Sequence, residues 1–327
     1  MNVRRWIARR GPNWKRLDGL LQQAEQRGIK ALSASEIKDL ASLYRSVSAD
    51  LARARTNKVG NVLTQDLQKL TARGYNQIYQ GSQRQEWQQV KEFYLWGFPQ
   101  VVRENWAYIA IATGSFFLAG IIAWWYGWRD PTFIAITVPQ HIIKIVEEDG
   151  ELWMGSIVGI EPLASSRITI NNLSVCFGAM AGGITAGLYT MFIMAYNGFS
   201  IGAVATLVGK NNLAYPFYAF VFPHGSLELP AIFFAGGAGL LIGKAMIFPG
   251  KYKRIDALKQ NSTKAAQLLF GIIPMLVIAG AIEGFFSPSP VIPSPIKYLF
   301  GTGLFILLVL YCLRQKQAVV IKQEAEI

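Results

Sequence analysis

Cysteine, histidine and charged residues are all scarce in this chain. Its 327 residues include 2 cysteines and 2 histidines, and 16% of them are charged. Cys176 and Cys312 both lie in apolar stretches, so we expect no disulfide framework. The chain also lacks a nucleotide-binding glycine loop and the His-Glu-x-x-His pattern of zinc proteases. We therefore expect no catalytic residues, no metal ligands and no cofactor.

A secretory leader is not expected either. Four arginines stand within residues 1–10, but no continuous apolar core follows them. This pattern fits neither a cleaved signal peptide nor twin-arginine export. The first membrane segment would then act as its own insertion signal.

Apolar and small residues are abundant, with 52% hydrophobic residues and 31 glycines. This composition is typical of a polytopic membrane protein. The net charge of +12 is uneven: residues 1–105 hold 18 basic and 9 acidic residues, whereas residues 106–170 hold 3 and 6. Because basic segments stay on the cytoplasmic side, we expect both termini and the basic 251–264 loop in the cytoplasm. Basic residues that lead directly into a membrane segment indicate a lipid partner, and we expect no nucleic acid partner.

Residues 1–83 are predicted to form a helical cytoplasmic region. Ser33-x-x-Glu36 is a capping box, and after it apolar residues recur three and four apart. These residues are Ile37, Leu40, Tyr44, Val47, Leu51 and Ala54. Their spacing favours a self-packed bundle over a partner-binding coiled coil. Residues 84–105 interleave aromatic and basic side chains around Pro99, which predicts an amphipathic helix in the membrane interface.

The remainder predicts an all-α membrane domain over residues 106–313 and a cytoplasmic tail over residues 314–327. About six spans are expected near 107–125, 174–196, 199–222, 227–248, 266–286 and 296–313. The third is interrupted by Gly209-Lys210-Asn211-Asn212 and by Pro216, so we expect it to be broken or re-entrant. The charge distribution favours a third span that crosses the membrane, since a re-entrant segment would put the basic 251–264 loop on the side opposite the cytoplasm.

A polar cluster interrupts the apolar stretch at residues 223–231. His224 and Glu228 lie one helical turn apart at the start of a long apolar run, and ionisable residues at membrane depth mark candidate functional sites. In the six-span topology, further polar residues fall near the same face or mark span ends. The predicted polar intramembrane site comprises His224, Glu228, Glu283, Asn171, Asn172 and Asn197. A structural alternative remains, in which residues 223–225 form a turn, Ser226 caps a helix and the asparagines are caps.

Small residues form faces on two predicted spans. They are Gly178, Gly182, Gly183 and Gly187 on one span, and Gly236, Gly239 and Gly243 on the other. Such faces allow close helix contact, either between subunits or within one subunit. We expect a homo-oligomer, with a dimer favoured.

Several of these residues occur in an ordered series. The series is Asn171-Asn172, Gly178 with Gly182, Asn197-Gly198, Gly202, Pro223-His224-Gly225-x-x-Glu228-x-x-Ala231, Gly236-x-x-Gly239-Leu240 and Ile282-Glu283-Gly284-Phe285 with Pro288. In this order, residues 105–313 resemble the stage II sporulation protein M-like integral membrane proteins. The resemblance implies a multipass protein of the prokaryotic plasma membrane, which in endospore formers works with cell-wall hydrolases during engulfment. The long N-terminal region and the tail depart from the short sporulation form.

The leading hypothesis is a non-enzymatic scaffold that holds cell-envelope partners through its N-terminal helices or outer loops. The alternative is a transporter or channel that uses His224, Glu228 and Glu283. An intramembrane metal-dependent hydrolase is less favoured, because Gly225 and Pro230 oppose a regular helix through the His224 segment.

Overall fold

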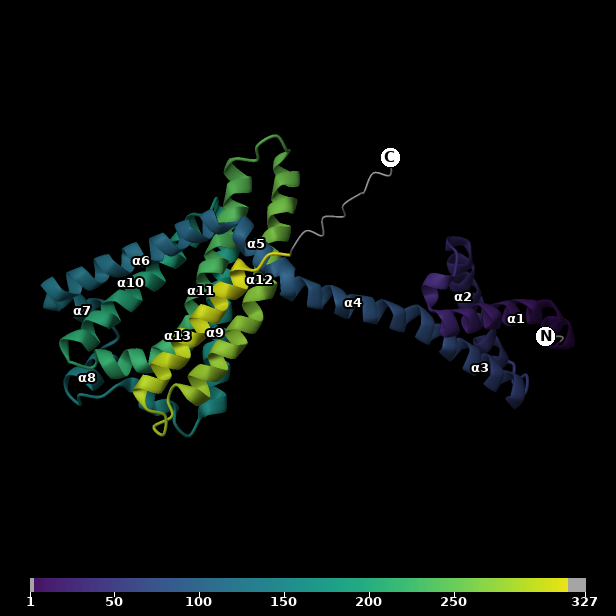
Figure 1. Ribbon diagram of the computed structural model, residues 1–327, viewed down its shortest axis with the longest axis horizontal. Helices are drawn as coiled ribbons and strands as arrows, with labels where there is room; N and C mark the ends of the chain where they lie inside the picture. The colour runs from purple at the N-terminus through teal and green to yellow at the C-terminus, as the bar shows by residue number, and fades with distance from the viewer. Residues whose placement is uncertain (1–2, 317–327) are drawn as a thin grey trace, which may run out of the picture. The chain divides into compact units, whose positions relative to one another are not determined.

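The computed structural model describes residues 3–316, and every regular element in that range is helical (Figure 1). The chain divides into two compact units, Met1–Glu92 and Phe93–Ile327. Six helices are long and apolar enough to cross a membrane. The predicted fold class, an all-α polytopic membrane protein, is therefore confirmed.

The first unit is a small helical bundle with its own core. Its helices are α1 (Val3–Arg27), α2 (Ala34–Thr56), α3 (Asn61–Tyr75) and α4 (Gly81–Glu92), with a π-helical turn at Asn76–Gln80. Leu40, Val47 and Ala54 of the predicted stripe are buried, whereas Ile37 is exposed. The stripe thus packs against α1 and α3 inside the unit. It does not form a separate surface for a coiled-coil partner.

The predicted capping box at the start of α2 is present. The Ser33 hydroxyl accepts a hydrogen bond from the Glu36 amide at 3.3 Å, and the Glu36 carboxylate accepts one from the Ser33 amide at 2.8 Å. These two bonds satisfy amides that a helix start leaves free, so they fix where α2 begins.

The segment predicted as one interfacial helix, residues 84–105, is divided between the two units. α4 ends at Glu92, and a π-helical turn Phe93–Gly97 then leads into α5 (Phe98–Glu104). Phe98 is buried against Gly271, Phe234 and Tyr311, where the missing glycine side chain leaves room for its ring. The aromatic residues at the end of this segment therefore pack against other helices of the membrane unit, not only against lipid.

The membrane unit is built from six candidate spans. These are α6 (Trp106–Arg129), α9 (Glu161–Ala181), α10 (Leu188–Lys210), α11 (Ala214–Ile247), α12 (Arg254–Ala281) and α13 (Ser294–Leu313). Short turns extend α9 to Thr185 and α12 to Phe286. A chain with six such helices and this composition is a multipass membrane protein.

The helix boundaries differ from the predicted second and third spans. The region 174–196 holds a turn, where the 3-10 turn Gly182–Thr185 is followed by Ala186 and Gly187 with left-handed backbones. The predicted break at 209–212 is the tight turn between α10 and α11, which Asn212 makes with a φ of 57°. No span is broken there, because residues 199–210 complete α10 and residues 214–222 begin α11.

α11 is the central helix of the membrane unit. It packs against α6, α9, α12 and α13, and most of its length is buried (Figure 1). Its 34 residues correspond to about 51 Å at 1.5 Å per residue, which is longer than the roughly 30 Å hydrocarbon core. α11 must therefore tilt or extend beyond the hydrocarbon layer.

α6 and α10 form a closely packed pair beside this centre (Figure 1). A Cβ on Gly198 would overlap the Phe116 backbone, and a Cβ on Gly202 would overlap the Gly120 backbone. The Thr206 hydroxyl also donates to the Trp124 carbonyl at 3.1 Å. Glycine thus lets the two helices approach through their backbones.

The segment between α6 and α9 folds onto the ends of α10 and α11. It contains α7 (Pro131–Thr137), α8 (Gln140–Glu147) and a 3-10 turn at Trp153–Ile157. Their apolar side chains form two small cores with α10 and α11. This segment is therefore a packed cap.

The glycines predicted as packing faces contact other helices of the same chain. A Cβ on Gly243 would lie 2.8 Å from the Gly187 nitrogen, a Cβ on Gly183 would overlap the Gly239 carbonyl oxygen, and a Cβ on Gly239 would overlap the Ala179 carbonyl oxygen. A Cβ would lie 2.6 Å from the Thr190 nitrogen if built on Gly182, 2.7 Å from the Met194 sulfur on Gly236 and 3.3 Å from the Ile193 Cδ1 on Gly178. These faces hold α9, α10 and α11 together within one subunit, so the homo-oligomer stays a prediction without their support.

Candidate functional site

The site begins with two side chains on one face of α11. His224 and Glu228 are separated by one helical turn, and α11 runs unbroken through both. Pro223 and Pro230 lie inside the helix, so the expected turn and new helix start are wrong. The Ser226 hydroxyl does not cap a helix, since it donates to the Pro223 carbonyl at 2.9 Å. Hydroxyls and neighbouring helices allow proline inside membrane helices.

A third ionisable side chain comes from α12. Glu283 lies in the π-helical turn Ile282–Phe286 that ends this helix. Its Oε1 is 3.8 Å from the His224 Nε2, and the nearest ligand atoms of His224, Glu228 and Glu283 all lie within 4.8 Å of one another. Such π-turns are frequent at functional sites. Residues about 60 positions apart thus form one cluster.

The His224 ring is held by a short chain of hydrogen bonds. Its Nδ1 lies 3.0 Å from the Ser287 hydroxyl, and the Lys297 ammonium donates to the Ser287 carbonyl at 2.6 Å. All three side chains are buried. The bond to Ser287 leaves Nε2 facing the two glutamates.

Two oxygens of the cluster have no hydrogen-bond partner among residues 3–316. They are Oε2 of Glu228 and Oε2 of Glu283, and both are buried. A buried oxygen without a partner is costly, and a buried charge without one more so. The cluster therefore has unused capacity to bind a proton or a cation.

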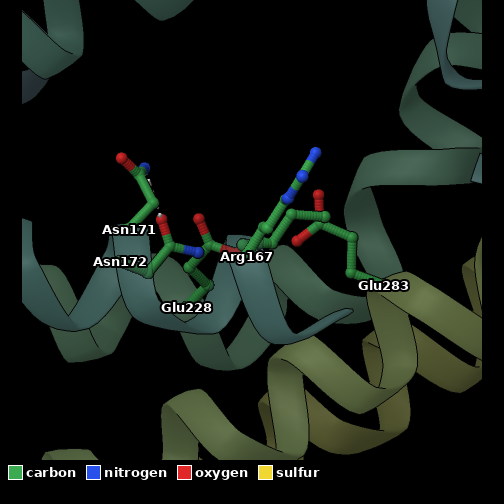
Figure 2. A pocket seen from close by; sticks show the side chains of 6 residues that line it. Arg167, Asn171, Asn172, Glu228 and Glu283 are labelled. Atoms are coloured by element: carbon green, nitrogen blue, oxygen red, sulfur yellow. Dashed lines mark hydrogen bonds between the residues drawn. The ribbon is translucent and has the colours of Figure 1, made fainter. Parts of the chain in front are cut away.

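A pocket of about 390 Å³ adjoins the two glutamates. Its other lining residues are Arg167, Ile168, Asn171 and Asn172, all on α9. Figure 2 shows the Asn172 amide beside the Glu228 carboxylate, with Glu283 reaching in from the other side. Arg167 and Asn171 are exposed, whereas Asn172 is buried. The polar cluster thus adjoins an open pocket beside α9.

Five of the six predicted site residues come together. His224, Glu228 and Glu283 form the cluster, and Asn171 and Asn172 line the adjoining pocket. Asn197 is separate, because its amide donates to the Ile193 carbonyl of its own helix at 2.8 Å.

Three neighbours of the site were not predicted. Lys297 carried a usable signal, since it is a charged residue at the start of the last apolar run. Arg167 could have been found only with the correct start of α9. Ser287 carries no signal in the sequence, because its role depends on how α12 and α13 meet.

The site lies well inside α11, whereas Glu283 joins it from the turn that ends α12. Glu228 is 14 residues after the start of α11, or about 21 Å along the helix axis. Histidine beside two carboxylates offers one nitrogen and several oxygen donors, which can bind a cation or exchange protons.

Comparisons with known proteins locate this site in a family. The family model for Stage II sporulation protein M matches residues 112–288. The chain belongs to the stage II sporulation protein M family. The match contains His224, Glu228, Glu283 and both pocket asparagines, but ends before Lys297. The predicted resemblance is thereby confirmed. A second family model, a domain of unknown function (DUF8413), matches residues 4–80 in the first unit.

Two archaeal relatives share part of the chain. Uncharacterized protein MJ0793 of Methanocaldococcus jannaschii is 30% identical over 124 residues, which is 37% of this chain and 70% of that protein. Uncharacterized protein MJ0706 of the same organism is 26% identical over 121 residues. That alignment spans 35% of this chain and about half (51%) of the relative. No solved structure matches.

Proposed function

We propose that this protein is a non-enzymatic membrane scaffold that anchors a helical unit beside the membrane and assembles envelope partners on it. The observation that supports this most is the joining of two units with separate cores in one chain. The first unit buries its apolar stripe internally. Partners would then bind to the polar outer surface of this unit.

Charge supports an arrangement with both termini in the cytoplasm of a prokaryotic cell. Six crossings return the chain to the side where it began. The basic residues of 1–105, of the 251–264 region and of the end of α13 then share one side, as expected for cytoplasmic segments. The cap formed by α7 and α8 would lie outside, together with the α12–α13 loop. Envelope partners could then meet the protein on either face.

Crosslinking in native membranes tests the scaffold. The full chain and a variant without residues 1–92 would be purified after crosslinking, and their partners compared by quantitative mass spectrometry. We expect a defined set of envelope proteins to be lost with the first unit, while the membrane unit still inserts. A partner set unchanged by the deletion would argue against a scaffold built on these helices.

A second candidate function is cation or proton transport. The specific observation in its favour is the buried cluster of His224, Glu228 and Glu283 beside an open pocket. Proteoliposome flux would be compared for the natural chain, for Glu228→Gln and for Glu151→Gln, which alters an exposed glutamate of the cap. Transport predicts that flux is lost only in Glu228→Gln. Equal flux in all three would remove this candidate.

The homo-oligomer also belongs to this proposal, with a dimer as the expected state. Since the predicted glycine faces pack within one subunit, the contact between copies would use other surfaces. The molar mass of the protein in detergent, measured by light scattering with the detergent contribution subtracted, distinguishes a monomer from a dimer.

A further inference from the structure

We propose that His224, Glu228 and Glu283 bind one divalent first-row transition metal ion inside the membrane unit. This inference is independent of the scaffold and holds whether the ion is carried across the membrane or retained. It begins from the geometry, since donor atoms from two different helices lie within 4.8 Å of one another. A protein that holds such atoms around one point needs only modest movement to coordinate an ion.

The donor atoms define the class of metal. Imidazole nitrogen suits zinc, iron, nickel and copper, whereas carboxylate oxygen suits magnesium, calcium and manganese. One nitrogen with two carboxylates is a mixed set, which favours ions such as Zn²⁺, Fe²⁺ and Mn²⁺. Oxygen-seeking Ca²⁺ and Mg²⁺ should bind much more weakly.

Charge balance supports a divalent ion. Two partly buried carboxylates, each with one buried oxygen that lacks a partner among the described residues, are stabilised if they are protonated, paired or bound to a cation. One Oε2 on each glutamate lacks a partner among the described residues, and the Lys297 ammonium is hydrogen-bonded to the Ser287 carbonyl. A single divalent ion would neutralise both carboxylates and use the free oxygens. Neutral His224 would add a ligand without adding charge.

The surroundings of His224 fit a metal ligand. Metal-binding histidines usually fix one ring nitrogen with a hydrogen bond and coordinate with the other. Here Nδ1 lies 3.0 Å from the Ser287 hydroxyl, while Nε2 faces Glu283 at 3.8 Å. Ser287 itself is buried, and Lys297 holds its backbone. Ser287 is therefore the positioning residue for the ligand.

Binding would draw the carboxylates inward. Ligand atoms of a tetrahedral zinc site lie about 3.3 Å apart, given metal bonds of about 2.0–2.1 Å. The present separations reach 4.8 Å. Rotation of the two glutamate side chains can close this difference, because both face the adjoining pocket. The same pocket offers a route for the ion and space for a water ligand.

The test is metal binding by the purified full chain in nanodiscs, made with a tag that contains no histidine. The protein would be treated with a chelator, incubated with ZnCl₂ or MnCl₂, desalted and analysed by elemental mass spectrometry. We expect about one metal ion per chain, with a thermal midpoint that rises on loading. CaCl₂ and MgCl₂ should give neither effect.

Four variants make the test specific. Glu228→Gln and Glu283→Gln keep side-chain shape and should weaken zinc binding at least about tenfold, while Ser287→Ala should weaken it about tenfold through His224. His141→Asn is the matched control, because it removes the other histidine of the chain, which lies on α8 away from the cluster. Thermal midpoints of the metal-free proteins show which variants remain folded.

Two outcomes would overturn the proposal. One is a natural chain that binds no zinc or manganese and shows no change in thermal midpoint, which would leave the cluster as protonated, hydrogen-bonded side chains. The other is equal metal content in the natural chain, both glutamine variants and His141→Asn. That result would mean an adventitious ion only.

Discussion

A methyl group placed between α6 and α10 tests whether the membrane unit is packed as described. A Cβ on Gly198 would overlap the Phe116 carbonyl oxygen and lie 2.7 Å from its carbonyl carbon, whereas ordinary contacts are 3.4–4 Å. The obstructing atoms belong to the backbone, so no side chain can rotate away. Gly198→Ala therefore requires the two helices to separate.

The expected cost can be isolated with a matched control. Forcing extra atoms into a packed region costs about 1–3 kcal/mol, while replacing glycine by alanine in a helix favours the helix by up to about 1 kcal/mol. Gly114→Ala makes the same change on α6, where a Cβ meets nothing within 4 Å. Because the gain in helix propensity is common to both variants, Gly198→Ala should be less stable than Gly114→Ala by about 1–3 kcal/mol.

Unfolding by increasing mole fraction of sodium dodecyl sulfate, followed by tryptophan fluorescence, provides the measurement. At 1.4 kcal/mol per factor of ten, the two variants should differ by about 5-fold to 150-fold in their unfolding equilibrium constant. Gly202→Ala should behave like Gly198→Ala, since its Cβ would overlap the Gly120 backbone. Equal stability of Gly198→Ala and Gly114→Ala would refute the close contact between these helices.

Two further predictions concern the first unit, and hydrogen exchange of the full chain would measure both in peptides from α1 and α2. Asp50 is fully buried and accepts hydrogen bonds from Arg10 at 2.7 Å and Trp14 at 3.0 Å. Arg10→Met leaves this buried carboxylate without its main partner and should destabilise the unit by about 3 kcal/mol. Unchanged protection of the α1 and α2 amides from hydrogen exchange would contradict this prediction. Ser33→Ala should cost about 1 kcal/mol at the start of α2. The Ser33 hydrogen bonds hold the pKa of Glu36 below its usual 4.5, so this carboxylate stabilises α2 fully above that pH and progressively less as the pH falls below it. Ser33→Ala should therefore weaken the acid dependence of α2 protection, and an unaltered pH profile would show that the capping box does not contribute to it.

Local sequence signals predicted local structure well and assembly poorly. The capping box at Ser33 and the count of six spans depend on neighbouring residues and on composition, and both are confirmed. The boundaries were harder to predict, because Gly182–Gly187, which was predicted to lie within one span, forms a turn whose glycines still pack against neighbouring helices. At Pro223 the error is the reverse, because the sequence suggests a turn and a new helix start there, whereas α11 continues through it. In both places tertiary packing outweighs local propensity.

The candidate site shows the same limit. His224, Glu228 and Glu283 could be found because ionisable residues are rare in apolar runs. That the three side chains lie close together could be predicted only through an assumed membrane topology. The contact of Ser287 with His224 depends on how α12 and α13 are joined. Sequence reasoning therefore identified the three clustered ionisable groups but neither the neighbouring Lys297 and Arg167 nor Ser287, which orients the histidine.

The cluster can be judged structural or functional by its effect on stability. The buried Oε2 of Glu283 has no hydrogen-bond partner among the described residues, and neutral His224 keeps its contact with Ser287 if Glu283 is removed. A buried carboxylate oxygen without a hydrogen-bond partner carries a desolvation cost, which an apolar side chain of similar volume removes. We therefore expect metal-free Glu283→Met to unfold at the same or a higher detergent mole fraction than the natural chain, while losing metal binding. If Glu283→Met is instead destabilised by more than about 2 kcal/mol, the carboxylate holds α11 and α12 together, and its burial needs no bound ion to explain it.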